Sequence, residues 1–133
     1  MMRFAGYAAL FGIPDAARDT IVPGAFTRTL AERASRRATL PLYWQHRPDQ
    51  PIGTVELAEE DERGLRIIAR IDNSASRAAA ALQGRSVNGL SFGYRARGYT
   101  NGPQGRVLHD IDLFEVSLVT QPLQAGARVH LLT

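Results

Sequence analysis

The sequence predicts a mainly β fold with flanking helices, closed or nearly closed into a mostly antiparallel barrel of about seven strands. Apolar runs of strand length, separated by glycine, proline and polar turns, recur along the whole chain. Two pairs of these runs form long antiparallel hairpins, which favour a barrel over a doubly wound parallel sheet. With 133 residues, the chain has the length of one domain, so we expect a single domain over residues 1–133.

Composition excludes several classes of protein. Hydrophobic residues make up 44% and charged residues 22%, as in soluble globular domains. No apolar run approaches the roughly 18–20 residues that span a bilayer, and the N-terminus lacks the apolar core of a signal peptide. The absence of cysteine rules out disulfides, a thiol nucleophile and a cysteine-based zinc site. We therefore expect a cytoplasmic protein with no membrane partner.

The charge balance does not favour a nucleic-acid partner. The net charge is +3, and every basic residue other than histidine is an arginine. These arginines are scattered, and only Arg33, Arg36 and Arg37 cluster. The aromatic platform on which single-stranded nucleic acids stack is missing.

The N-terminal part predicts a strand, a loop and a helix. Residues 3–11 have the composition of a strand that ends at Gly12, and a proline-containing loop follows. Residues 25–37 carry Phe26 and Leu30 at helical spacing and end in arginines, which suit the negative end of the helix dipole. We expect this helix to cap one end of the β core.

The next strands are predicted at residues 40–46, 52–59 and 65–72. Residues 40–46 form an extended run that His46 closes at its loop end, and the prolines of residues 47–51 predict a rigid loop after it. Residues 52–59 and 65–72 form the clearest hairpin, because a polar link ending in glycine joins them.

A short alanine-rich helix is expected at residues 75–83. Asn73 or Ser74 can cap its first turn, and Gly84 is placed to end it. Strands at residues 89–99, 106–120 and 128–132 complete the chain, the first two joined by a glycine-rich turn.

The strand around Ser91 has two unlike faces. Large side chains at Leu90 and Phe92 alternate with Gly89, Ser91 and Gly93. One face can therefore pack into the core, while the other is bare except for the Ser91 hydroxyl. Because glycine in a strand often marks the close approach of a ligand or another backbone, we expect Gly89 and Gly93 to bind an extended substrate.

Glu115 is the second unusual feature. From Leu113 onward its strand is apolar on both faces, so it should be central and covered. An ionised carboxylate there would cost several kcal/mol unless it is paired or hydrogen-bonded. The sequence therefore predicts an arginine or histidine partner for Glu115.

Serine, histidine and a buried carboxylate are the components of a nucleophilic triad. The histidine accepts the hydroxyl proton, and the acid fixes the imidazole tautomer. If the hairpin of residues 89–99 and 106–120 closes, Ser91 and Glu115 lie on neighbouring strands. The barrel would then have to bring His46 to them.

The residues around Ser91 also fit a second type of serine hydrolase. The Gly-x-Ser-x-Gly pattern around Ser91 matches the nucleophile elbow of α/β hydrolases, with an acid at Asp112 or Glu115 and then His130. That fold needs a sharp strand-to-helix turn, whereas here the strand continues to Tyr99, so we reject it.

Residues near the second hairpin leave two further options open. His109 and Asp110 could bind a metal, and Asp110 with Asp112 could form an aspartic-type pair, but only proximity supports either. Phosphate-binding and dinucleotide motifs are absent. We therefore expect no metal and no cofactor.

Several blocks of the sequence carry a family resemblance. They are GYAALF (6–11), IVPGAF (21–26), WQH (44–46), PIG (51–53), GLSFGY (89–94) and LFEVSLVT (113–120). Over nearly its whole length the chain resembles the tailed-phage (HK97-like) prohead protease family, which also occurs in prophages and gene-transfer particles. That family is similar in fold to the herpesvirus assembly proteases, a β-barrel wrapped by helices.

The resemblance implies a serine endopeptidase that cleaves the scaffold region of capsid proteins during prohead maturation. It implies Ser91 as nucleophile, His46 as base and Glu115 as the third member, with Asp112 as the alternative acid. The expected partner is the major capsid protein or its scaffold polypeptide, inside the assembling prohead of a bacterial host, and a homodimer is possible. A non-catalytic capsid-assembly or scaffold-binding module with the same barrel is the alternative function.

Overall fold

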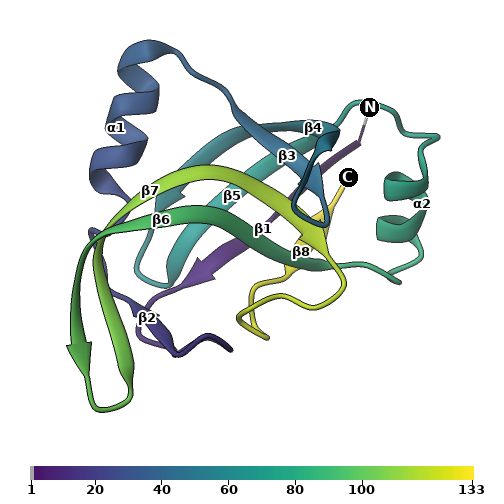
Figure 1. Cartoon of the computed structure of the whole chain (residues 1–133). Helices are drawn as coiled ribbons and strands as arrows, with labels where there is room; N and C mark the ends of the chain where they lie inside the picture. The colour runs from purple at the N-terminus through teal and green to yellow at the C-terminus, as the bar shows by residue number, and fades with distance from the viewer. Residues whose placement is uncertain (1) are drawn as a thin grey trace.

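One curled β-sheet with two helices makes up the computed structural model, which describes residues 2–133 (Figure 1). The strands are β1 (Met2–Leu10), β2 (Asp19–Ile21), β3 (Leu40–Trp44), β4 (Arg47–Glu60), β5 (Gly64–Ile71), β6 (Gly89–Gly102), β7 (Gly105–Val119) and β8 (Val129–Leu132). The helices are α1 (Thr27–Arg36) and α2 (Arg77–Gln83). The predicted mainly β class with flanking helices is confirmed.

Strand pairing is mostly antiparallel, in the order β2-β7-β3-β4-β5-β1-β8, and β6 pairs with β7. β4, β5 and β1 are consecutive antiparallel neighbours, as the predicted hairpin of residues 52–59 and 65–72 requires. Two pairings are parallel, β2 with β7 and β3 with β7. In Figure 1 the sheet bends around its interior, with α1 and α2 at opposite sides.

β7 joins the halves of the molecule. Along one edge it runs antiparallel to β6, with Gly89 opposite Val119 and Gly102 opposite Gly105 at the two ends of the hairpin. Along its other edge it pairs with β2 near its start and with β3 near its end. The end of β7 therefore lies between β6 and β3, two strands that are far apart in sequence.

The core fills the inside of the curl. Its largest fully buried side chains come from most of the strands and from the segment before α1; they are Phe4, Ile21, Phe26, Leu42, Leu65, Ile67, Ile71, Leu90, Leu108, Ile111, Leu113 and Leu118. Phe26 packs edge-on against Phe92, with 5.5 Å between ring centroids. Because strand side chains alternate, Leu90 and Phe92 face this core and Ser91 faces away from it.

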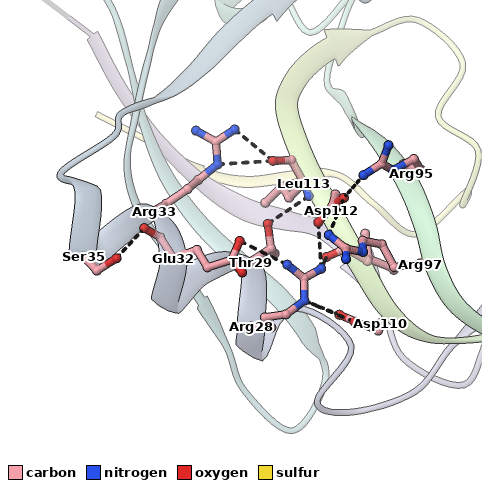
Figure 2. Close-up of polar contacts among 11 residues, drawn as sticks. Arg28, Thr29, Glu32, Arg33, Ser35, Arg95, Arg97, Asp110, Asp112 and Leu113 are labelled. Atoms are coloured by element: carbon pink, nitrogen blue, oxygen red, sulfur yellow. Dashed lines mark hydrogen bonds and ion pairs between the residues drawn. The ribbon is translucent and has the colours of Figure 1, made fainter.

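Helix α1 caps one side of the sheet, as predicted. The Glu60 carboxylate accepts hydrogen bonds from the backbone N–H groups of Gly24 and Phe26, each at 2.8 Å, and so fixes the segment that leads into the helix. Arg28 on the helix then reaches the Asp110 and Asp112 carboxylates of β7 (Figure 2). Neither α1 nor α2 is long and apolar enough to cross a membrane.

The structure contains one strand that the sequence analysis assigned to a loop. Strand β2 lies within the predicted loop after Gly12, and the buried Asp19 fastens it to the long hairpin. Asp19 accepts hydrogen bonds from the Arg106 guanidinium at 2.8 and 2.9 Å and from the Tyr94 hydroxyl at 2.7 Å. This pairing depends on side chains from distant strands, which a local pattern does not contain.

Two other predictions were wrong in detail. Residues 47–51 form the start of β4 instead of a loop. This exposed segment pairs with β3, and its prolines are tolerated there because each lacks only the N–H that would donate to a neighbouring strand. The cap of α2 is Ser76, whose hydroxyl accepts from the Ala79 N–H at 3.2 Å. Asn73 instead closes a turn before the helix by accepting from the Ala75 N–H.

Candidate active site

His46 lies on a strained two-residue turn between β3 and β4. Trp44 pairs with Arg47, so Gln45 and His46 form the turn, with φ of 52° and 61°. Positive φ at both positions is what a type I′ hairpin turn requires, and it is unfavourable for most side chains, although asparagine, aspartate and histidine adopt it more often than the others. His46 is therefore not the last residue of a strand, as predicted, but lies in the turn itself.

Hydrogen bonds to the end of β7 hold this turn. The Gln45 N–H donates to the Leu118 carbonyl at 2.9 Å, and the His46 N–H donates to the Ser117 hydroxyl at 3.1 Å. The Gln45 side-chain oxygen accepts from the Thr120 N–H at 3.2 Å. Together with the parallel β3–β7 pairing, these bonds bring His46 to β7.

Glu115 has a histidine partner, one of the two types predicted from the sequence. Its side chain is only 9% exposed, and its Oε1 lies 2.5 Å from Nδ1 of the exposed His46 ring. Its second oxygen, Oε2, accepts from the Ser117 hydroxyl at 2.6 Å. The hydrogen bond to Glu115 raises the pKa of His46, with a further contribution from the negative charge, while partial burial of the ring acts in the opposite direction.

Ser91 is brought to the same face by the β6–β7 ladder. It stands directly opposite Ser117, and Gly93 stands directly opposite Glu115. Residues opposite each other have Cβ atoms about 4.5–5.5 Å apart on one face of a sheet. Ser91, Ser117 and Glu115 therefore share the outer face of β6 and β7, and His46 reaches this face from β3.

Two serines lie at this site, and their hydroxyls differ in hydrogen bonding. The Ser117 hydroxyl is bonded to Glu115 and to the His46 backbone. Within residues 2–133 the Ser91 hydroxyl makes no hydrogen bond, although Ser91 is only 3% exposed. In free enzymes the bond between nucleophile and base is often long and tightens when substrate binds.

The glycines beside Ser91 have a structural reason of their own. A Cβ atom on Gly93 would lie 2.5 Å from Oε1 of Glu115, and one on Gly89 would lie 2.8 Å from the Pro122 ring. Gly93 thus leaves the space that the Glu115 carboxylate occupies. Substrate binding by Gly89 and Gly93 stays a prediction.

Asp112 points to a different part of the protein. Its carboxylate accepts from Arg28 at 2.7 Å and from Arg95 at 2.8 Å (Figure 2). The hydrogen bond from Arg28 holds the pKa of Asp112 below its usual value, with Arg95 contributing in the same direction. Among the described residues the carboxylate beside His46 is that of Glu115, and Asp112 is bound to arginines.

The remaining candidate residues do not gather at one site. Asp110 pairs with Arg28 at 3.0 Å, and the His109 ring lies 3.2 Å from the Thr100 hydroxyl. The His130 ring packs edge-on against Tyr7. Over residues 2–133, no group of three or more acidic or histidine side chains is arranged to hold a metal.

Sequence reasoning missed Ser117 and Gln45. Ser117 follows Glu115 by two positions, and the two-residue period of a strand alone places both on one face. That signal was available. The role of Gln45 could not be predicted from the sequence, because it depends on the positive φ of the turn.

Three solved structures with a similar fold are viral proteases. The chain matches the protease of KSHV, solved with a hexapeptide phosphonate inhibitor, with a TM-score of 0.65 and 16% identity over 99% of this chain and 64% of that one. It matches the varicella-zoster virus protease with a TM-score of 0.61 and 18% identity, covering 97% and 63% of the two chains. The bacteriophage T4 capsid assembly protease, gp21, gives a TM-score of 0.69 and 12% identity, covering 90% and 82%. These likenesses define the class of fold, that of the herpesvirus-type proteases.

Sequence comparison narrows the class to one family. The model described as Caudovirus prohead serine protease matches residues 1–133, so the chain belongs to that family. The prohead protease of Enterobacteria phage HK97 is 36% identical over 132 residues, which cover 92% of this chain and 57% of that protein. The capsid polyprotein of Pseudomonas phage PAJU2 is 26% identical over 127 residues, covering 87% of this chain and 18% of the polyprotein. The chain thus spans little more than half of its phage HK97 relative.

Proposed function

We propose that this chain is the catalytic part of a serine endopeptidase in which Ser91, His46 and Glu115 form the triad. The observation that carries the proposal is the 2.5 Å contact between Glu115 Oε1 and His46 Nδ1, on the face of the sheet that also carries Ser91. Family membership supports the same chemistry. Asp112 is a poor third member because arginines already bind it.

The mechanism follows from which ring nitrogen faces the acid. Glu115 accepts a hydrogen bond from the Nδ1–H of His46, which leaves Nε2 as the basic nitrogen. Nε2 removes the Ser91 proton as Oγ attacks the scissile carbonyl, and the resulting imidazolium is stabilised by the Glu115 carboxylate. The imidazolium then protonates the leaving amine. Water, deprotonated by the same nitrogen, releases the acyl group from Ser91 and restores the hydroxyl.

Backbone N–H groups would stabilise the oxyanion, since such donors need no reorganisation during reaction. We place them in the turn of residues 120–123, which follows β7 beside the site. The Thr120 N–H is engaged by Gln45, and Pro122 has no N–H to offer. This leaves Gln121 and Leu123 as the proposed donors.

The proposed substrate is the scaffold region of a capsid protein, cut during prohead maturation in the bacterial cytoplasm. The names of the two phage relatives, a prohead protease and a capsid polyprotein, support this assignment. An extended peptide could add as a strand along β6 beyond Leu90. In the described part of the chain, β6 pairs with β7 on one edge, and the start of its other edge is held by the Gly89–Arg128 bridge and by the Leu90 N–H, which donates to the Ala127 carbonyl at 2.8 Å. A homodimer stays a prediction, testable by sedimentation.

Replacement of Ser91 by alanine tests the proposal. Wild-type protein should be labelled by a fluorophosphonate and should cut a scaffold-bearing capsid protein. Ser91→Ala should lose both by about 10⁴-fold or more, because the nucleophile is gone. Ser86→Ala, which alters an exposed serine, is the matched control and should change neither.

The alternative function predicts a different result. A non-catalytic capsid-assembly or scaffold-binding module would bind scaffold without cutting it, and the wild-type protein would resist the fluorophosphonate. That outcome, with normal capsid assembly, would overturn the peptidase proposal.

A further inference from the structure

One buried hydroxyl touches both halves of the acid–base pair. Ser117 is fully buried, at 0% exposed, and stands on β7 directly opposite Ser91. Its O–H group donates to Glu115 Oε2 at 2.6 Å, and its oxygen accepts from the His46 backbone N–H at 3.1 Å. The hydroxyl uses its single proton for the hydrogen bond to the carboxylate, and a lone pair on its oxygen accepts the His46 N–H. One side chain therefore provides a hydrogen-bond partner for both groups.

The turn that carries His46 needs such an anchor. Both of its residues have positive φ, a conformation that persists only where the surroundings over-determine it. The Gln45 N–H donates to the Leu118 carbonyl, whereas the His46 N–H donates to the Ser117 hydroxyl. Without that acceptor, the imidazole would be held only by the backbone contacts of Gln45 and by the ring's own contact with Glu115.

The carboxylate has the same requirement. Glu115 Oε1 faces the imidazole, and Oε2 would be left buried without a donor if the Ser117 hydroxyl were removed. An unpaired buried oxygen favours rotation of the carboxylate toward water or toward another donor. Such a rotation would also break the contact with Nδ1 of His46.

We propose that Ser117 is the positioning residue of this site. Its hydroxyl holds the Glu115 carboxylate and the His46 turn in a fixed position relative to each other. The inference rests on the proposed function for its catalytic consequence, but not for its structural content. Ser117 does not itself attack substrate, because its proton is committed to Glu115. It acts on Ser91 only through the other two residues.

Ser117→Ala tests the proposal with two measurements. In fluorophosphonate labelling, the maximal inactivation rate should fall by about 10- to 100-fold while the concentration for half-maximal rate stays unchanged, since geometry and not binding is lost. In nitrogen NMR of the imidazole, neutral wild-type His46 should hold its proton on Nδ1, and Ser117→Ala should give a mixture of tautomers. His46→Gln assigns the signal.

Ser76→Ala is the matched control. It also removes a serine hydroxyl that accepts a backbone N–H, at the start of α2 and outside the candidate site. It should lower thermal stability while leaving the labelling rate and the His46 tautomer as in wild type. A loss of labelling in Ser76→Ala equal to that in Ser117→Ala would assign the effect to general destabilisation and overturn the proposal.

Amide exchange in the wild-type protein gives a test that needs no variant, should Ser117→Ala fail to fold. The His46 amide should exchange on the order of 100-fold or more slowly than in an unstructured peptide, despite its place in an exposed turn. Unprotected exchange would overturn the proposal, as would an unchanged tautomer in folded Ser117→Ala. If the wild-type protein is not labelled at all, the peptidase proposal fails, and the tautomer and exchange results still decide the role of Ser117.

Discussion

Two carboxylates on β7 have opposite surroundings. Glu115 contacts a histidine and a serine, while Asp112 contacts Arg28 and Arg95, with Arg97 at 3.5 Å. Arginine stays protonated at every physiological pH, so the Asp112 cluster is a permanent ion network that ties α1 to the hairpin. Histidine changes charge near neutrality, so the Glu115 pair can hold or release a proton.

This contrast shows that burial alone does not identify a functional acid. Both side chains are largely shielded, with 9% of Glu115 and 14% of Asp112 exposed. What separates them is whether the partner can give up its proton. A carboxylate saturated by guanidinium groups serves the fold, and one that faces an imidazole can serve proton transfer.

Within this comparison, the largest expected effect comes from neutralising the two acids in parallel. Glu115→Gln should lower fluorophosphonate labelling by about 10³- to 10⁴-fold, because the amide can turn its NH₂ group to the ring and favour the wrong tautomer. Asp112→Asn should keep labelling within about twofold and lower the melting temperature. Equal losses in the two variants would remove the distinction between the sites.

A pair of glycines on β6 extends the comparison. Gly93→Ala places a methyl group 2.5 Å from Glu115 Oε1, whereas in Gly98→Ala the methyl group would lie 3.3 Å from the Asp110 side chain, a contact that small shifts can relieve. We expect labelling by Gly93→Ala to fall by about 10- to 100-fold in maximal rate, and Gly98→Ala to stay near wild type. A change confined to the half-maximal concentration in Gly93→Ala would instead support substrate docking at this glycine.

The smallest effect is on pH dependence. Since His46 must be neutral to act as a base, labelling should be lost as the pH falls through its pKa, which the Glu115 hydrogen bond raises above the ordinary 6.5. In Glu115→Gln the midpoint should move down toward 6.5. A midpoint that does not move would show that Glu115 does not govern the imidazole.

The same comparison applies to folding stability, measured by urea unfolding across pH. The raised pKa of His46 means that the pair stabilises the fold fully below pH 6.5 and that this contribution is lost as the pH rises through the folded-state value. The lowered pKa of Asp112 gives the opposite window, with stability present above 3.8 and lost as the pH falls through its folded-state value. Glu115→Gln should flatten the first change and Asp112→Asn the second.

Much of the fold follows from local patterns. The alternation at Leu90 and Phe92 predicts which side of β6 faces the core, and the hairpin to β7 follows from its turn. Strand β2 could not be predicted because it is only three residues long, Asp19–Ile21, and its pairing depends on Arg106 and Tyr94. The start of β4 was missed because its prolines have the composition of a loop.

The site was predictable in its chemistry but not in its geometry. A carboxylate in an apolar strand needs a partner, and this rule alone restricts Glu115 to arginine or histidine. The residues alone did not decide between His46 and an arginine; the family resemblance indicated His46, and the contact itself depends on the parallel β3–β7 pairing, which links strands that no hairpin connects. The left-handed turn at Gln45 and His46 lay beyond prediction, since glutamine does not favour positive φ and a histidine alone does not mark a hairpin turn.

That parallel pairing has a consequence for when activity can arise. His46 and Glu115 are 69 positions apart, and nothing local draws them together before β7 is seated between β6 and β3. Contacts of such long range form slowly, because the chain must close a large loop first. A nascent or partly unfolded chain therefore has no assembled charge pair. The proposed protease would therefore be inactive until its own sheet is complete.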